Sequence, residues 1–200
     1  MTYLATLIFL LFTVTLQASI APVDVLVSAD PTSETVIIRS ATAVSHATTM
    51  SVFTQRGEQV YTADIAAGAY VSKRFPAAVL PAALYVLHFT DALGRTTLPF
   101  KIDESSTVQY SFAEGTHTLF PRVNMQEART LVLSYPATEQ CKAYRMTLQD
   151  AQGQTVFTDE VASTTSVRKA IQLEALHAGT YTIAFAADNR KLNSTAITLR

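Results

Sequence analysis

Four histidines are the side chains of this sequence best suited to bind a metal ion or to transfer protons: His46, His88, His117 and His177. A zinc site needs three or four ligands brought together, commonly with short spacing between some of them. No two of these histidines have that spacing. The sequence therefore predicts solvated surface histidines and no metal site.

Nucleophilic catalysis would need a Ser or Cys on a constrained turn beside a His and an acid. The sequence has no Gly-x-Ser-x-Gly, and its 6 Gly are too sparse for a phosphate-binding loop. The acids of the pairs Asp103-Glu104 and Asp159-Glu160 are adjacent, so in an extended chain their side chains point to opposite faces. We therefore expect no catalytic residues, no cofactor and no enzyme activity.

Aromatic side chains could instead bind a sugar, because β-sandwiches often carry sugars on aromatic platforms. The chain has 8 Tyr and 10 Phe but no Trp, which is the best stacking residue. Most of these rings fall on strand faces that we expect to be buried. The weak candidates for ligand contact are Tyr70, Tyr110 and Tyr144.

The elements that must position these residues come from an internal repeat. Gly57-Glu58-Gln59-Val60-Tyr61-Thr62 matches Gly153-Gln154-Thr155-Val156-Phe157-Thr158, at an offset of 153 − 57 = 96. The same offset, without a gap, pairs further residues of the two halves, among them Val36 with Val132, Met50 with Met146, Lys73 with Lys169, and Tyr85 with Tyr181. The pattern indicates duplication of a whole small domain.

Each copy contains short runs in which apolar and polar residues alternate, as they do in half-buried β-strands. We expect strands at 23–27, 35–39, 49–54, 59–62, 70–75, 84–90 and 96–102, and again at 119–123, 130–135, 143–149, 155–158, 167–173, 180–186 and 194–199. This number of short strands is typical of an immunoglobulin-like sandwich. The predicted fold is all-β, with two tandem immunoglobulin-like antiparallel β-sandwich domains at 22–104 and 118–200. Residues 105–117 are expected to be a linker or an extra edge strand.

Two kinds of turn carry specific structural chemistry. Gly57 and Gly153 separate alternating runs, and glycine can take the positive φ that such hairpin turns need. A leucine, then a small residue, then a tyrosine two residues later resemble a tyrosine corner, in which the tyrosine hydroxyl forms a hydrogen bond with the backbone upstream. Both copies carry this spacing, in Leu80, Ala83 and Tyr85 and in Leu176, Gly179 and Tyr181. Because Ala83 replaces the glycine, we expect the first corner to differ from the second.

The first residues indicate export. An uncharged apolar run from about Leu4 to Leu16, followed by small residues, predicts a signal peptide at 1–21. Cleavage would start the mature chain between Ser19 and Val23, with no membrane span left; the alternative is an uncleaved N-terminal anchor. The formal net charge of −1 gives no basic surplus for nucleic acid. The one cysteine, Cys141, cannot form an intramolecular disulfide.

The second copy resembles a known family. The run Leu148-Gln149-Asp150-Ala151-Gln152-Gly153-Gln154-Thr155-Val156, with the later Leu176 and Gly179-Thr180-Tyr181, is similar to β-sandwich domains of secreted Bacteroidetes proteins. These include the C-terminal sorting domains of the type IX (Por) secretion system and small exported relatives of unknown function. The Tyr-Pro-Asn-Pro signature of such sorting domains is absent, and Leu119 to Asn124 occupies its place.

From these patterns we expect an exported binding or structural protein that is secreted, periplasmic or located at the cell surface. The leading hypothesis is a protein–protein adhesion or scaffold module of the cell envelope, whose partner is a protein or glycan at the cell surface. The alternatives are a carbohydrate-binding module and a sorting module for type IX secretion. An apolar edge or an inter-domain cleft would favour a protein partner, and a shallow aromatic strip would favour sugar.

Overall fold

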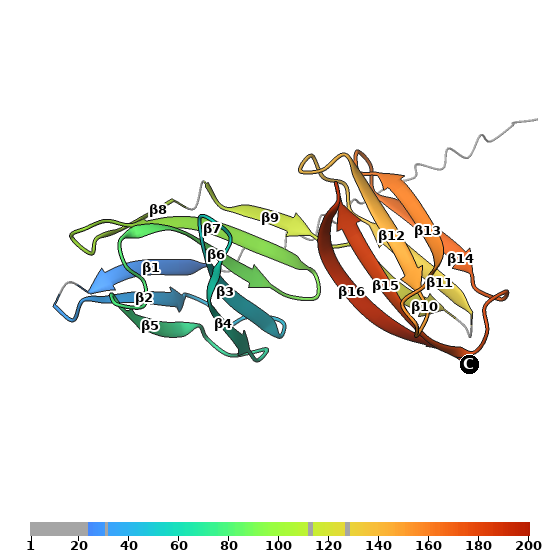
Figure 1. The fold of residues 1–200 in the computed structure, drawn as a ribbon, viewed down its shortest axis with the longest axis horizontal. Helices are drawn as coiled ribbons and strands as arrows, with labels where there is room; N and C mark the ends of the chain where they lie inside the picture. The colour runs from blue at the N-terminus through green and yellow to red at the C-terminus, as the bar shows by residue number, and fades with distance from the viewer. Residues whose placement is uncertain (1–23, 31, 112–113, 127–128) are drawn as a thin grey trace, which may run out of the picture.

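The computed structural model describes residues 24–30, 32–111, 114–126 and 129–200. Figure 1 shows two β-sandwiches end to end, called here the first sandwich (Val25 to Leu119) and the second sandwich (Arg122 to Leu199). The predicted all-β, immunoglobulin-like class is confirmed. The predicted signal peptide at 1–21 lies outside the described residues.

The first sandwich packs a three-stranded sheet against a larger one. The smaller sheet has the order β1-β2-β5, with β1 at Val25–Asp30, β2 at Thr35–Ser40 and β5 at Ser72–Pro76. The larger has the order β4-β3-β6-β7-β8, with β3 at Thr48–Thr54, β4 at Gln59–Ile65, β6 at Ala83–Thr90, β7 at Gly94–Ile102 and β8 at Val108–Tyr110.

The second sandwich repeats this strand order. One sheet runs β10-β11-β14, with β10 at Arg122–Gln126, β11 at Thr130–Tyr135 and β14 at Val167–Gln172. The other runs β13-β12-β15-β16, with β12 at Ala143–Gln149, β13 at Thr155–Ala162, β15 at Gly179–Ala187 and β16 at Arg190–Leu199. It has the order β4-β3-β6-β7 of the first sandwich, and within the described residues β8 has no counterpart in it.

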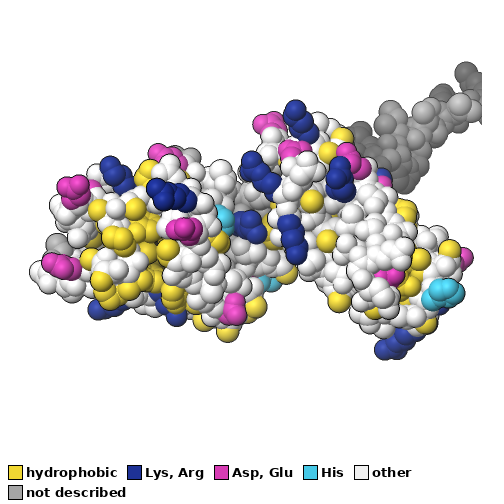
Figure 2. All heavy atoms as spheres, viewed as in Figure 1, with side chains coloured by type: hydrophobic (Ala, Val, Ile, Leu, Met, Phe, Trp, Pro, Cys, Tyr) yellow, Lys and Arg dark blue, Asp and Glu magenta, His cyan; other side chains and the backbone are white. Residues whose placement is uncertain are grey.

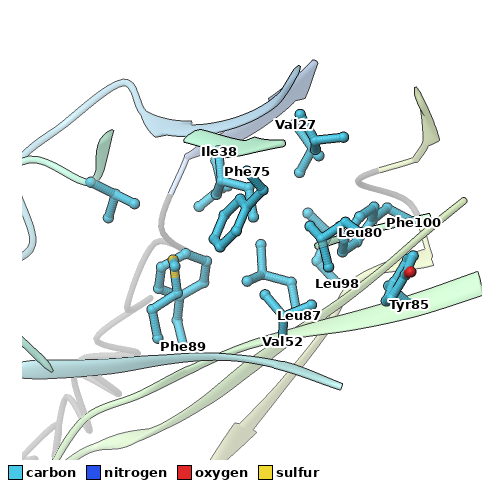
Figure 3. Packing of buried hydrophobic residues seen from close by; sticks show 14 of the residues in the cluster. Val27, Ile38, Val52, Phe75, Leu80, Tyr85, Leu87, Phe89, Leu98 and Phe100 are labelled. Carbon is cyan, nitrogen blue, oxygen red and sulfur yellow. The ribbon is translucent and has the colours of Figure 1, made fainter. Parts of the chain in front are cut away.

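Alternation along the strands builds a separate core in each sandwich. Figure 3 shows Leu87 and Phe89 pointing from β6 toward Ile38 and Phe75 of the facing sheet. Burying one such side chain contributes about 1.5–3 kcal/mol. The core of the second sandwich is built in the same way around Ile183 and Phe185 of β15, and among the described residues it shares none with the first core.

The turn glycines repeat in detail. Gly57 and Gly153 have φ of +85° and +80°, a region in which a side chain is strained. Their N–H groups donate to the carbonyl oxygens of Thr54 at 2.9 Å and Asp150 at 3.0 Å. In both hairpins the pairing register shifts at the same place, before Phe53 and before Gln149, so the β-bulge is duplicated together with the turn.

The gap-free repeat needs one correction. Val36 lies opposite Phe75, and Leu131 lies opposite Ile171, so Val36 corresponds to Leu131. The pairing of Val36 with Val132 is therefore wrong by one residue. Such a slip exchanges the two faces of a strand, because successive side chains alternate.

The segment between the sandwiches covers the outer edge of β7. β8 pairs with the end of β7, from Phe100↔Tyr110 onward, and β9 (Thr116–Leu119) pairs with its beginning, from Gly94↔Leu119 to Thr97↔Thr116. The predicted linker thus joins the first sheet, and the change to the second sandwich comes at residues 120 and 121, which are both buried.

Gly94 permits the close approach of β9. A Cβ atom on this residue would lie 2.5 Å from the carbonyl oxygen of Thr118. Asp91 holds the preceding turn, since its carboxylate accepts hydrogen bonds from the N–H groups of Leu93 at 2.7 Å and Gly94 at 2.8 Å. The position therefore requires glycine for space.

Candidate functional site

The three candidate tyrosines lie on different elements and form no common platform. Tyr70, between β4 and β5, is 66% exposed, whereas Tyr110 on β8 packs against the first core. Tyr144 on β12 is fully buried, with its ring centroid 5.9 Å from that of Tyr135. The prediction of Tyr144 as a ligand contact is wrong, because its ring fills the second core.

Replacing Tyr144 with Phe is expected to leave the second sandwich at least as stable as the wild type. The polar neighbour of the Tyr144 hydroxyl is the Cys141 thiol, and no oxygen or nitrogen atom of the described residues forms a hydrogen bond with this hydroxyl. Burial, followed by the neighbouring Cys141, raises the pKa of Tyr144. A buried hydroxyl without any partner costs about 1–3 kcal/mol, and a thiol is only a weak partner, so Tyr144→Phe removes at most a penalty of that order. Hydrogen exchange of the β12 amides measures the change; clearly faster exchange in the variant contradicts this expectation.

The two tyrosine corners have the same geometry. The hydroxyl of Tyr85 donates to the carbonyl oxygen of Pro81 at 2.8 Å, and that of Tyr181 donates to His177 at 2.9 Å. Leu80 is fully buried in the first core, and Leu176 packs against the second. These residues hold turns and fill core volume.

The expectation that the first corner differs is wrong. Gly179 does not adopt a positive φ, so its backbone is open to alanine. A Cβ on Gly179 would meet only the ring of Tyr181, at 3.9 Å, which is ordinary contact. Ala83 therefore serves the first corner without strain.

The histidines lie on separate elements. His46 is exposed, with Nδ1 3.8 Å from Asp91 Oδ2, and His177 lies in the turn before β15. His88 and His117 are partly exposed. Burial, with Arg95 second, lowers the pKa of His88, and the Nε2 atom of His117 is buried without a partner in the described chain. Among all residues that the structure describes, no group of three or more His, Cys, Asp or Glu side chains could hold a metal ion.

A cation–π contact and two side-chain hydrogen bonds lie at the joint between the sandwiches. Phe120 is 2% exposed, and the guanidinium of Arg95 lies 5.8 Å from its ring centroid. The Thr118 hydroxyl donates to Gln140 Oε1 at 2.7 Å, and Gln140 Nε2 donates to the carbonyl oxygen of His117 at 3.0 Å. β9 is thereby tied to the loop that precedes β12.

A cleft of about 490 Å³ opens beside this joint. We call it the basic cleft, and its lining includes Arg95, Thr97, Thr118, Gln140, Arg190 and Lys191. Figure 2 shows Lys and Arg side chains gathered where the second sandwich faces the first. The cleft therefore combines cations with hydroxyl and amide groups, the chemistry that binds carboxylates.

A tight hairpin turn presents two of these cations. Asp188 and Asn189 have φ of +44° and +68°, as in the two-residue turns that favour positive φ at both positions. Asp188 is the one acid that the described chain contributes to the lining. Its two carboxylate oxygens each accept a hydrogen bond from the N–H of Lys142 at 3.0 Å. The cleft keeps a positive surplus, because its lining has three cations, Arg95, Arg190 and Lys191, against this one carboxylate.

Sequence reasoning missed the basic cleft. The available signal was local: Arg190 and Lys191 directly follow two turn-forming residues, Asp188 and Asn189. Arg95 lies in the other copy, and only the fold brings it to the same cleft. No sequence motif links these residues, because they belong to two domains and lie far apart in the chain.

The fold is that of a protein with two β-sandwiches in tandem, and the basic cleft at their joint is open to solvent. Within the chain, residues 128–198 match the model of the secretion system C-terminal sorting domain. The resemblance to type IX sorting domains is thus confirmed for the second sandwich. The domains that this model describes belong to secreted or cell-surface proteins.

Several solved structures are similar over most of the chain. The BSP domain of a biofilm associated protein is 14% identical, with a TM-score of 0.30, and covers 88% of this chain, which spans 29% of that structure. A two-domain fibronectin type-III segment of chicken tenascin is 13% identical, with a TM-score of 0.30 and coverage of 90% and 98%. Native alpha-2-macroglobulin from Escherichia coli, spanning domains NIE-MG1, is 11% identical, with a TM-score of 0.26 and coverage of 89% and 98%.

No protein of curated function matches the chain. Among the described residues, no helix has the length and apolar character needed to cross a membrane.

Proposed function

We propose that this chain is an exported, non-enzymatic binding protein that presents its basic cleft to a protein partner at the cell surface. The observation that carries the proposal is the cleft itself, in which Arg95 of one sandwich faces Arg190 and Lys191 of the other. An open cleft with charged rims suits a macromolecular ligand, because small-molecule sites enclose most of their ligand. Complementary charge would steer an acidic partner to it.

A sorting role is the second candidate, supported by the family match of residues 128–198. In that case the secretion machinery would be the partner of the second sandwich. A carbohydrate ligand has less support. Among the described residues, the aromatic side chains that are large and exposed are Tyr70 and Phe157, which belong to different sandwiches and form no strip.

The test combines export with charge reversal in the full chain. The protein, produced in a bacterium with a type IX system, should reach the medium or the cell surface and begin between Ser19 and Val23. Photo-crosslinkers placed around the basic cleft should capture an envelope protein. The capture should disappear in Arg190→Glu/Lys191→Glu but persist in Arg122→Glu/Arg168→Glu, which changes the charge equally at exposed positions on the other sheet.

Two results would contradict the proposal. Retention of the protein in the cytosol with Met1 intact would show that the protein is not exported. Equal capture by wild type and by Arg190→Glu/Lys191→Glu would show that the basic cleft is not the binding surface.

A further inference from the structure

The two sandwiches treat the same edge of their larger sheet differently. In the first, β8 and β9 pair along the outer edge of β7. In the second, β16 occupies the place of β7, and no strand of the described chain pairs with its outer edge. Figure 1 shows β16 on the side of the second sandwich that faces the first. Three residues at the beginning of this strand, Arg190, Lys191 and Leu192, line the basic cleft.

The beginning of β16 carries features that discourage strand pairing. Arg190 and Lys191 are charged and exposed, and the register with β15 shifts between Ala184 and Ala186, where Leu192 and Asn193 form a bulge. Charges and bulges are the means by which proteins protect an open edge. The Oδ1 atom of Asn193, at this bulge, is buried and has no partner among the described residues.

The rest of β16 lacks this protection. Residues 194–199 read Ser-Thr-Ala-Ile-Thr-Leu, without charge or proline, and pair in regular register with β15 from Ala184↔Ser194 to Gly179↔Leu199. Three of these six residues, Thr195, Ile197 and Thr198, are β-branched, a residue type that favours a sheet. Its outer N–H and C=O groups form a template for one more strand.

We propose that β16 is the docking site of an extended, acidic segment of a partner protein. The segment adds to residues 194–199 as a strand, and its carboxylates lie against Arg190, Lys191 and Arg95 in the basic cleft. This inference rests on the proposed function and names the form and charge of the partner. Main-chain hydrogen bonds supply affinity in such strand addition, and the charges select the sequence.

Charge also argues against a second copy as the occupant. Antiparallel pairing of two β16 strands about the middle of residues 194–199 would set Arg200 of one copy opposite Asn193 of the other, because 196 + 197 = 193 + 200. Arg200 would then lie near Lys191 and Arg190 of the second copy at both ends of the pair. Like charges in such positions are destabilising.

The direction of the segment follows from the first sandwich. There, both strands that cover β7 run antiparallel to it. A segment antiparallel to β16 begins beside Leu199 and ends beside Arg190. Its acids therefore belong at its C-terminal end.

Synthetic peptides test this arrangement with the full chain. The probe is Thr-Val-Thr-Val-Thr-Val-Asp-Glu-Asp, acetylated and labelled at its N-terminus, with binding followed by fluorescence anisotropy. Three controls change one property each: the same residues with the acids first, a tail of Asn-Gln-Asn, and two adjacent prolines in place of the central Thr-Val, so that one missing N–H faces β16 in either register. Hydrogen exchange of the β16 amides reports strand formation directly.

We expect the probe to bind and to slow exchange of the amides at residues 194–199. The proline peptide should lose binding, because one of its two adjacent prolines lacks the N–H group that the ladder with β16 needs. The neutral tail, the reversed peptide and the variant Arg190→Gln/Lys191→Gln should each weaken binding about tenfold, and added salt should weaken binding of the acidic probe.

Three outcomes overturn the inference. Equal binding of the proline peptide, without protection of β16, would mean that the cleft binds acids without strand addition, and the proposed function would survive. Absence of binding by every peptide would remove the docking site, while the crosslinking experiment would still decide the function. Concentration-dependent protection of β16 in the free protein would identify a second copy as the occupant.

Discussion

Replacing Tyr181 with Ala is expected to lower the free energy of unfolding of the second sandwich by about 3–5 kcal/mol, as for other large aromatic truncations. The ring is 7% exposed and lies in the core beside Ile183 and Phe185. Its hydroxyl also holds the turn before β15, through the 2.9 Å bond to His177. Truncation therefore removes core volume and releases the turn together.

Tyr181→Phe separates the two contributions. It keeps the ring and removes only the hydrogen bond, at about 0.5–1.5 kcal/mol. Hydrogen exchange of the full chain, followed segment by segment, should show faster opening in β10 to β16 and unchanged exchange in β1 to β7. The matched substitution Tyr85→Phe, which removes the bond to Pro81, should reverse that pattern. Unchanged exchange in Tyr181→Ala would show that the side chain has no structural role.

Replacing Gly94 with Ala is expected to destabilise the first sandwich by about 1–3 kcal/mol, as overpacking does, and to release β9. The new Cβ would lie 2.5 Å from a backbone oxygen, that of Thr118, and backbone cannot rotate aside as a flexible side chain can. Because Thr118 also bonds to Gln140, the joint should loosen with β9. Faster exchange at residues 116–119 and a broader range of inter-domain distances in small-angle scattering would report the change.

Gly179→Ala is the matched control for Gly94→Ala. It places the same methyl group in a strand glycine with free space around it, where the first copy already has alanine. It should therefore leave the amides of both sandwiches as protected as in the wild type. If the β9 amides stayed protected in Gly94→Ala, the prediction would be contradicted, because β9 would have moved to accommodate the methyl group while it remained paired with β7.

The elements predicted well from the sequence are those with a local signal. Gly57 and Gly153 mark their hairpins because only a few residue types accept a positive φ. Alternation in Ala143 to Leu148 also placed Tyr144 on the same face as Met146, so its burial could have been predicted.

The parts that could not be predicted lacked alternation or depended on tertiary placement. Val36 to Ile38 and Leu131 to Leu133 are continuous apolar runs, so nothing in them distinguishes the core face from its neighbour. The strand expected at 119–123 instead begins at Arg122, because Leu119 belongs to β9 and pairs with Gly94. The basic cleft depends on how two domains are placed, which periodicity does not encode.

The attachment of β9 also determines how the molecule would respond to mechanical load. β9 runs along the long axis of the molecule toward the second sandwich, antiparallel to β7 (Figure 1). A pull on the second sandwich reaches the first through Leu119, and the ladder bonds of β9 lie across the direction of that pull. These bonds are then sheared together rather than opened one at a time. A chain held at a cell surface and pulled by its partner would thus resist extension at this strand, while Phe120 and Pro121 act as the short coupling between the two bodies.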